Sequence, residues 1–204
     1  MKYFITAIGT DSGKTIVSAI FAETLGSDYW KPIQAGYPTD TDTVKNLLSS
    51  DNTCFFEEAY LLNTPASPHE AAKIDNVKID LKSIKLPDTG KDLIIEGAGG
   101  LMVPLNQHEL VIQMAKQFDC EVILVCNLYL GSINHSLLSL DYLKNNQYKI
   151  RGIIFNGTSN PESEQIILNY ANVTCLLRVD QEEEMNKERV EHYATILKRN
   201  LINE

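Results

Sequence analysis

The residues with the clearest chemical potential form a short loop near the start of the chain, Gly9-Thr10-Asp11-Ser12-Gly13-Lys14-Thr15. An apolar run precedes this loop and a helical pattern follows it, so backbone N–H groups and a helix N-terminus would converge on one point and attract anions. The usual phosphate-binding loop has a glycine five residues before the glycine of its Gly-Lys-Thr. Ile8 occupies that position here, and Gly9 lies only four residues before Gly13. Because Lys14 can still reach the β- and γ-phosphates and Thr15 offers Mg²⁺ a hydroxyl, we expect a shortened loop that binds a nucleoside triphosphate.

Three other segments carry polar or glycine residues where an apolar run ends, which is where ligands bind in parallel sheets. Lys31 lies at the end of the first of these runs, Glu96 ends the second just before Gly97–Gly100, and Gly131–His135 follows the third. A carboxylate such as Glu96 can coordinate Mg²⁺ or orient a ligand, and neighbouring glycines allow close backbone approach. Taken alone, these residues also fit an exposed lysine, a bare turn and, for His135, a structural imidazole, which is the role we favour for that residue.

The elements that would position these residues alternate between strand and helix. Short apolar runs rich in β-branched and aromatic residues are typical of strands covered on both faces, and they lie at 2–8, 29–33, 92–97, 121–127 and 150–156. Helical patterns lie at 14–26, 109–118, 134–146 and 161–172. This order predicts an α/β fold of the P-loop NTPase type, with a parallel sheet, helices on both faces and a single domain over residues 1–204.

Two segments depart from that alternation. Residues 51–90 contain Pro65, Pro68 and Pro87 and show mixed periodicity, which predicts a long irregular excursion from the sheet. Residues 180–189 are strongly acidic, and we interpret them as the solvated start of a helix.

Composition and charge narrow the classes of function. The chain of 204 residues has 44% hydrophobic and 22% charged residues, as is usual for a globular protein. Its 18 basic against 27 acidic residues give a net charge of -9, which repels phosphate backbones and argues against nucleic acid as a partner. No apolar run approaches the roughly 20 residues that span a bilayer, and the N-terminus does not resemble a signal peptide. We therefore expect a cytoplasmic protein that does not bind membranes.

The ordered set of Gly9–Thr15, Lys31-Pro32, Glu96–Gly100 and Gly131–His135 resembles the dethiobiotin synthetase family, over residues 1 to about 156. The resemblance implies an ATP-dependent cyclo-ligase of biotin biosynthesis that uses Mg²⁺ and works as a homodimer with its substrate site near the subunit interface. It would convert 7,8-diaminopelargonic acid and CO₂ to dethiobiotin. A carbamate on one amine attacks the γ-phosphate, and the second amine closes the ring on the carbamic-phosphoric anhydride. Such chemistry depends on positioning and charge neutralisation.

The resemblance also implies roles for individual residues. Lys14 and Lys31 would be catalytic, with Lys14 on the β/γ-phosphates and Lys31 between the carbamate and the γ-phosphate. The metal ligands would be Thr15, Asp42 and Glu96, although Asp40 stays open as the alternative acid and either aspartate also fits a helix N-cap. The nucleotide would contact Asp11, Ser12, Gly13, Lys14, Thr15, Ile16, Asp42, Glu96, Gly97, Ala98, Gly99 and Asn156. The diamine would contact Thr10, Lys31, Ala35 and Gly100, together with Ser132, Ile133 and Asn134 from a partner subunit.

The chain departs from the family pattern in three places. Its phosphate loop has two residues fewer than Gly-Thr-Asp-Thr-Glu-Val-Gly-Lys-Thr, and Ala35 stands where a serine or threonine is common. The segment 174–190 lacks the proline-containing stretch that lines the base pocket, which leaves the preferred nucleotide base open.

A second hypothesis is a P-loop ATPase switch of the partition or septum-site type that acts through a protein partner. Those ATPases carry a second lysine inside the loop, and Gly9–Gly13 contains none. We therefore favour the enzyme. Hydrolysis that depends on a small diamine rather than on a protein or membrane partner would separate the two hypotheses.

Overall fold

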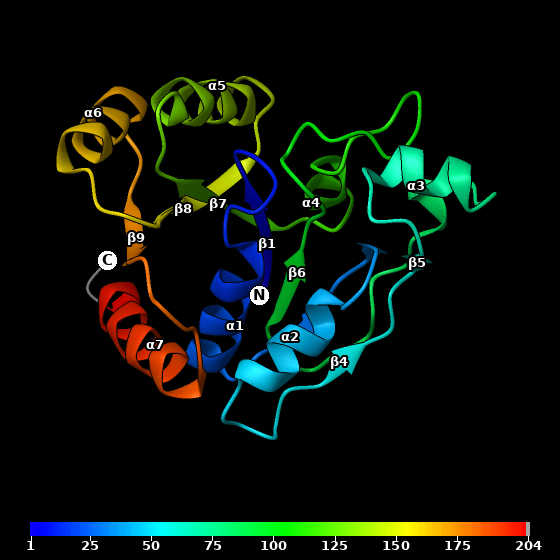
Figure 1. Ribbon diagram of the computed structural model, residues 1–204, viewed down its shortest axis with the longest axis horizontal. Coiled ribbons are helices and arrows are strands. Elements are labelled where there is room, and N and C mark those ends of the chain that lie inside the picture. Colours follow the sequence, from blue (N-terminus) through cyan, green and yellow to red (C-terminus); the bar gives the residue numbers. More distant parts are fainter. Residues whose placement is uncertain (203–204) are drawn as a thin grey trace.

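The structure is a computed structural model that describes residues 1–202. Its main sheet has seven parallel strands in the order β4-β2-β6-β1-β7-β8-β9 (Figure 1). The strands are β1 Lys2–Ala7, β2 Asp28–Trp30, β4 Phe55–Phe56, β6 Leu93–Glu96, β7 Glu121–Asn127, β8 Lys149–Asn156 and β9 Cys175–Val179. Because the strands are parallel, the ends of β1, β2 and β6 lie at the same edge, and each leads into one of the polar segments identified in the sequence.

Helices cover both faces of this sheet, which confirms the predicted α/β fold class. One face carries α1 Lys14–Leu25, α2 Asp40–Leu47 and α7 Lys187–Ile202, and the other carries α4 Gln113–Gln117, α5 Ser132–Asn145 and α6 Pro161–Ala171 (Figure 1). Side chains alternate along β1, so Tyr3 and Ile5 pack under α1 while Phe4 packs on the opposite side. The two apolar layers bury both faces of the sheet beneath the phosphate loop. None of the helices within residues 1–202 has the length and apolar character that a membrane crossing requires.

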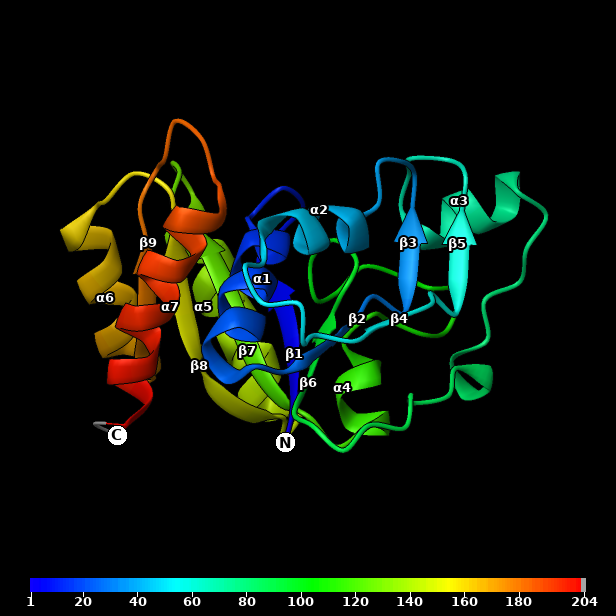
Figure 2. The same cartoon turned by 90° about the horizontal axis from the view of Figure 1, so that it is seen from below.

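The expected strand at 29–33 is two strands, and the break falls at Pro32. Pro32 has no N–H for the ladder, and its carbonyl accepts a hydrogen bond from the Tyr60 N–H at 3.0 Å. The chain therefore leaves the main sheet after β2 and forms β3 Ile33–Ala35, which pairs in parallel with β5 Tyr60–Leu62 in a separate two-stranded sheet (Figure 2).

Two helix predictions need correction. The pattern at 109–118 is helical only over Gln113–Gln117, because the Val111 and Ile112 N–H groups bond to the carbonyls of Val103 and Leu101 instead. The acidic run at 180–189 is mostly a loop, and α7 begins only at Lys187.

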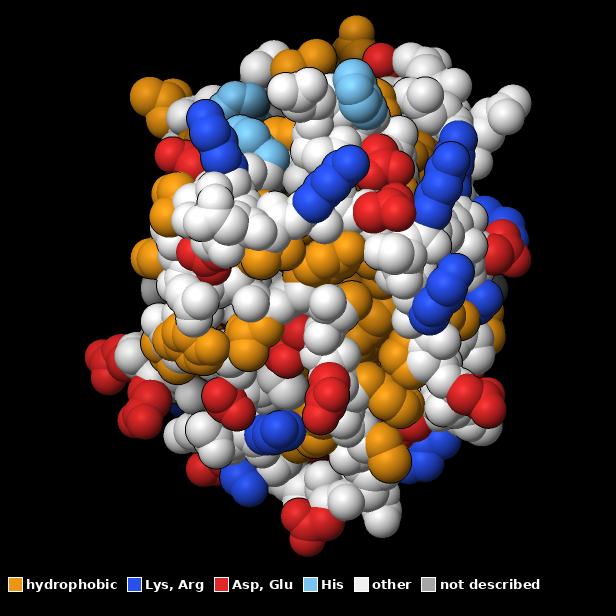
Figure 3. Space-filling view, turned by 90° about the vertical axis from the view of Figure 1, so that its right-hand side faces the viewer, with side chains coloured by type: hydrophobic (Ala, Val, Ile, Leu, Met, Phe, Trp, Pro, Cys, Tyr) orange, Lys and Arg blue, Asp and Glu red, His pale blue; other side chains and the backbone are white. Residues whose placement is uncertain are grey.

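The excursion at 51–90 is more ordered than its sequence predicts. It contains β4, β5, helix α3 Pro68–Ile74 and a 3₁₀ turn at Leu81–Ser83. The buried Asp28 carboxylate connects the start and the end of this excursion. It accepts one hydrogen bond from the Cys54 N–H and another from the Thr89 hydroxyl. Leu61, Ile74, Val77 and Leu86 of the excursion are exposed, and Figure 3, which looks onto this side of the molecule, shows apolar side chains interspersed with basic and acidic ones.

Candidate active site

The phosphate loop, Gly9–Thr15, connects β1 to α1 in the order that anion binding requires. Asp11 and Gly13 have φ values of 54° and 90°, in the left-handed region that favours glycine at Gly13. The buried Ser12 hydroxyl donates to the Gly9 carbonyl at 3.1 Å and closes the loop from inside. No side chain caps α1 at Gly13, so the first N–H groups of this helix stay available to an anion. The shortened loop thus keeps the geometry of a phosphate site.

Asn156, at the end of β8, supports this loop from two strands away in the sheet. Its Nδ2 donates to the Ser12 carbonyl at 3.0 Å. A Cβ atom added at Gly13 would overlap the same amide group. In this structure the residue expected to meet the nucleotide base therefore contacts the loop backbone, and its contact with the base stays a prediction.

Replacing Gly13 with alanine tests this packing. The new Cβ would clash with Asn156, and a left-handed alanine is strained by about 1–2 kcal/mol. We expect nucleotide affinity to fall about tenfold, measured by titration with a fluorescent ATP analogue. Gly90→Ala is the matched control, because a Cβ there meets nothing within 4 Å. Unchanged affinity in Gly13→Ala would show that the loop tolerates a side chain at this point.

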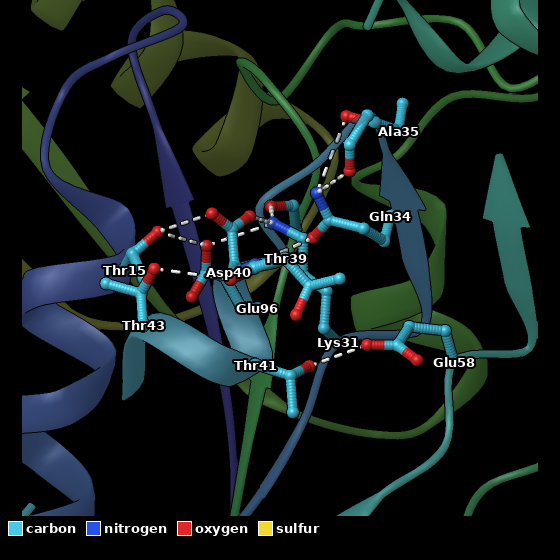
Figure 4. Close-up of polar contacts among 12 residues, drawn as sticks. Thr15, Lys31, Gln34, Ala35, Thr39, Asp40, Thr41, Thr43, Glu58 and Glu96 are labelled. Carbon is cyan, nitrogen blue, oxygen red and sulfur yellow. Dashed lines mark hydrogen bonds and ion pairs between the residues drawn. The ribbon is translucent and has the colours of Figure 1, made fainter. Parts of the chain in front are cut away.

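Four side chains converge beside the loop and form what we call the Lys31 cluster: Thr15, Lys31, Asp40 and Glu96 (Figure 4). Lys31 Nζ lies 2.5 Å from Asp40 Oδ2 and 2.9 Å from Glu96 Oε1, and it donates to the Gly97 carbonyl at 3.0 Å. The Thr15 hydroxyl donates to Glu96 Oε1 at 2.9 Å and lies 3.1 Å from Asp40 Oδ1. The ammonium group thus stands where oxygen atoms of three residues face a common point.

The charges of this cluster are mutually dependent. Burial by itself lowers the pKa of Lys31, but Glu96 and Asp40 outweigh it and the net pKa of Lys31 is raised. Burial raises the pKa of Asp40, yet the charge and hydrogen bond of Lys31 bring it below its usual value. Burial lowers the pKa of Lys14, and the charge of Lys31 adds to that effect. The positive charges of Lys14 and Lys31 therefore balance the negative charges of Asp40 and Glu96. A bound triphosphate would add negative charge to this site, which a divalent cation would neutralise.

The second acidic position needs revision, because the structure places Asp40 and not Asp42 in the cluster. Asp42 is exposed. Its carboxylate accepts a hydrogen bond from the Thr39 hydroxyl at 2.7 Å, and its N–H donates to the same hydroxyl at 3.0 Å, an N-cap arrangement for α2. Asp40 is the first residue of α2 and reaches both Lys31 and Thr15. The geometry therefore favours Asp40 as the acid of a metal site.

The donor set fits a small, hard cation. Within residues 1–202 no group of three or more His, Cys, Asp or Glu side chains is arranged to hold a metal ion. The cluster instead offers two carboxylates and one hydroxyl, and Lys31 Nζ is the positive charge that they surround. Mg²⁺ commonly binds through one or two carboxylates together with phosphate oxygens and water.

A cavity of about 770 Å³ opens beside the cluster, between the phosphate loop, β3 and α3. It brings together most of the predicted site residues, namely Thr10, Asp11, Ser12, Gly13, Lys14, Thr15, Ile16, Lys31, Ala35, Glu96, Ala98 and Gly99, and its lining adds Pro65–Pro68 from the excursion. Asp42, Gly97 and Asn156 do not line it. A second cavity of about 390 Å³ is lined by Gly9, Thr10, Gly100 and the first turns of α5. Gly100 thus belongs to the second cavity, and Ser132, Ile133 and Asn134 lie at the start of the helix that bounds it.

Sequence reasoning missed two residues that support the cluster. Gln34 is buried, accepts from the Asp40 N–H at 3.1 Å and donates to the Gly36 carbonyl at 3.1 Å, which closes the turn that presents Asp40. Tyr29 is buried in β2 and donates its hydroxyl to Glu96 Oε2 at 2.9 Å. Neither residue carries a local motif, because each acts through contacts with a segment that only the fold brings near.

The sequence is similar to those of a known protein family. The profile of a family described as an AAA domain matches residues 1–189. The ATP-dependent dethiobiotin synthetase BioD of Cytophaga hutchinsonii is 54% identical over 198 residues, which cover 96% of each chain. The enzyme of the same name from Christiangramia forsetii is 49% identical over 202 residues, which cover 98% of this chain and 97% of the relative.

Solved structures of more distantly related proteins have a similar fold. A ParA family ATPase from Chlorobium tepidum superposes with a TM-score of 0.59 at 13% identity, covering 99% of this chain and 97% of that one. The septum site-determining protein MinD from Pyrococcus horikoshii, complexed with Mg-ADP, gives 0.58 at 16% identity and covers 98% and 96%. At these identities the likeness shows the P-loop fold alone and does not favour the switch hypothesis.

Proposed function

The chain belongs to the dethiobiotin synthetase family, and we propose that its Lys31 cluster carries out the ring closure that defines the family. The enzyme is an ATP-dependent dethiobiotin synthetase. The observation that carries the assignment of residues is the convergence of Thr15, Lys31, Asp40 and Glu96 between the phosphate loop and the main cavity. We also propose that residues 1–204 form one domain, since helices at both ends of the chain pack on the same sheet.

Two lysines would act on the transferring phosphoryl group. Lys14 projects from the first turn of α1 beside the loop and would hold the β- and γ-phosphates. Lys31 would neutralise the carbamate oxygen as it attacks the γ-phosphate, and ADP would then leave. The second amine would attack the carbamoyl carbon and release phosphate. Positive charges in fixed positions are worth most where negative charge develops in a dry site, and Lys31 is only 3% exposed.

Thr15, Asp40 and Glu96 would hold Mg²⁺ together with the nucleotide. When bound, the ion would neutralise charge on the β- and γ-phosphates. The protein would keep the three oxygen donors within reach of one point. The contacts of Thr15 and Lys31 with both carboxylates support this arrangement.

The diamine would lie between the two cavities. Thr10 lines both of them, so its position suits a substrate whose amines face Lys31 while its carbon chain follows the second cavity. Ala35 and Gly100 would contact the same substrate, and Ser132, Ile133 and Asn134 of a partner subunit would bind its carboxylate. Met102 and Leu138, which line this cavity and are exposed, support a homodimer with the site near its interface. We propose a cytoplasmic location for this enzyme.

Inorganic phosphate release tests the proposal. With Mg-ATP and bicarbonate, we expect release only when 7,8-diaminopelargonic acid is present. Repeating the assay with GTP and CTP measures how far the base is recognised without the proline-containing segment that the family has near its C-terminus. Release that ignores the diamine would contradict the proposed reaction and would favour a switch.

A further inference from the structure

Tyr29 reaches the proposed metal site from within the core. In the parallel register Tyr29 pairs with Ile94, two residues before Glu96 along β6. Side chains alternate along a strand, so Ile94 and Glu96 lie on the same side of β6 as Tyr29. The side chains of Tyr29 and of Lys31, which follows β2, both reach Glu96. The Tyr29 hydroxyl donates to Glu96 Oε2 at 2.9 Å, and Tyr29 and Glu96 are 0% and 1% exposed.

The two oxygens of Glu96 have different partners, and this difference fixes the carboxylate plane. Oε1 accepts from Thr15 and Lys31, which belong to the Lys31 cluster, whereas Oε2 accepts from Tyr29. The last torsion of a glutamate side chain is otherwise broad. Without the hydroxyl, only the bonds to Oε1 would restrain the carboxylate, and its plane could rotate away from the arrangement seen here.

We propose that Tyr29 is a positioning residue for the metal site: its hydroxyl holds the Glu96 carboxylate so that Oε1 stays with Thr15 and Lys31, beside which Mg²⁺ would bind. This inference rests on the proposed function. It means that the affinity of the site for Mg²⁺ depends in part on Tyr29, a buried residue of β2. Residues that hydrogen-bond metal ligands typically change metal affinity by about 10- to 100-fold when they are removed.

Tyr29→Phe removes the hydroxyl and keeps the ring that packs against Phe55, whose centroid lies 5.9 Å away. We expect Mn²⁺ to bind the variant about tenfold more weakly in the presence of ADP, measured by the electron paramagnetic resonance of free Mn²⁺. The Mg²⁺ concentration that half-saturates phosphate release should rise by a similar factor, whereas kcat at saturating Mg²⁺ should stay within about threefold. Binding of ADP in EDTA should not change.

Tyr3→Phe is the matched control, because Tyr3 is buried in the same apolar layer and its hydroxyl donates a hydrogen bond to Met1 Sδ, away from the Lys31 cluster. A purely structural role for Tyr29 would lower the melting temperature of Tyr29→Phe and leave Mn²⁺ binding equal to that of Tyr3→Phe, which would overturn the inference. Failure of the wild-type protein to bind Mn²⁺ with ADP, or to release phosphate with the diamine, would instead overturn the proposed function.

A measurement on the wild-type protein keeps the inference testable if Tyr29→Phe does not fold. The buried Tyr29 hydroxyl proton should exchange slowly and give a separate proton resonance. We expect this resonance to shift when Mg-ADP is added, because the ion draws electron density from Glu96. A resonance that is indifferent to Mg-ADP would show that Tyr29 and the metal site are not connected.

Discussion

Substitution of Lys31 by alanine should lower diamine-dependent phosphate release by roughly 100- to 1,000-fold, the usual loss when one group that stabilises a transition-state charge is removed. Lys31 is the buried cation nearest to both carboxylates of the cluster, and its raised pKa keeps it protonated at neutral pH. The loss should appear in kcat, because the developing charge between carbamate and γ-phosphate would lack its counterion. Steady-state phosphate assays at saturating diamine and Mg-ATP measure it.

The control for this variant is Lys198→Ala, which removes an exposed lysine of α7 far from the cluster in the sequence. Its activity should match that of the wild-type protein. Because Lys31 balances two carboxylates, circular dichroism and ADP binding must show that Lys31→Ala is folded. A folded Lys31→Ala variant that keeps more than about a tenth of the wild-type kcat would contradict a role in phosphoryl transfer.

The two aspartates at the start of α2 should respond very differently to substitution. Asp40→Asn removes one of the two negative charges of the cluster, and we expect activity at low Mg²⁺ to fall by about 100-fold. Asp42→Asn alters an exposed residue in the first turn of α2, and we expect a change of less than about twofold, because Thr39 remains the capping residue.

Mg²⁺ titrations of phosphate release for both variants measure this difference. More Mg²⁺ should partly rescue Asp40→Asn, since the site keeps Glu96 and Thr15. The reverse ranking, with Asp42→Asn the more damaged variant, would show that Asp42 binds the metal after a rearrangement of α2.

Elements whose signal is local could be predicted from the sequence. The run at 121–127 is a strand over the same residues, because it is apolar throughout and has no competing pattern. Gly26 ends α1 in the left-handed conformation that its residue type favours. The break at Pro32 also has a local cause. Its hydrogen-bond partner, the Tyr60 N–H, belongs to the excursion, and no sequence pattern predicts that pairing.

The site shows the same division between local and tertiary information. The phosphate loop, Lys31 and Glu96 have distinctive neighbours in the sequence. Asp40 and Asp42 both fit the start of a helix, and the choice depends on how the turn held by Gln34 presents α2 to β2. Tyr29 appears in the sequence as one more aromatic residue of a buried strand. Its function becomes visible only when β2 and β6 are paired.

Transfer of oxygen from CO₂ to phosphate tests the central claim most directly. In a short reaction with ¹⁸O- and ¹³C-labelled bicarbonate, the diamine and Mg-ATP, the carbamate oxygen should form the new bond to the γ-phosphorus and leave with it. We therefore predict one ¹⁸O atom in each released phosphate and ¹³C in the ring carbonyl of dethiobiotin, both measured by mass spectrometry. Phosphate without ¹⁸O would mean that water attacks the nucleotide, and it would contradict the proposed role of the Lys31 cluster.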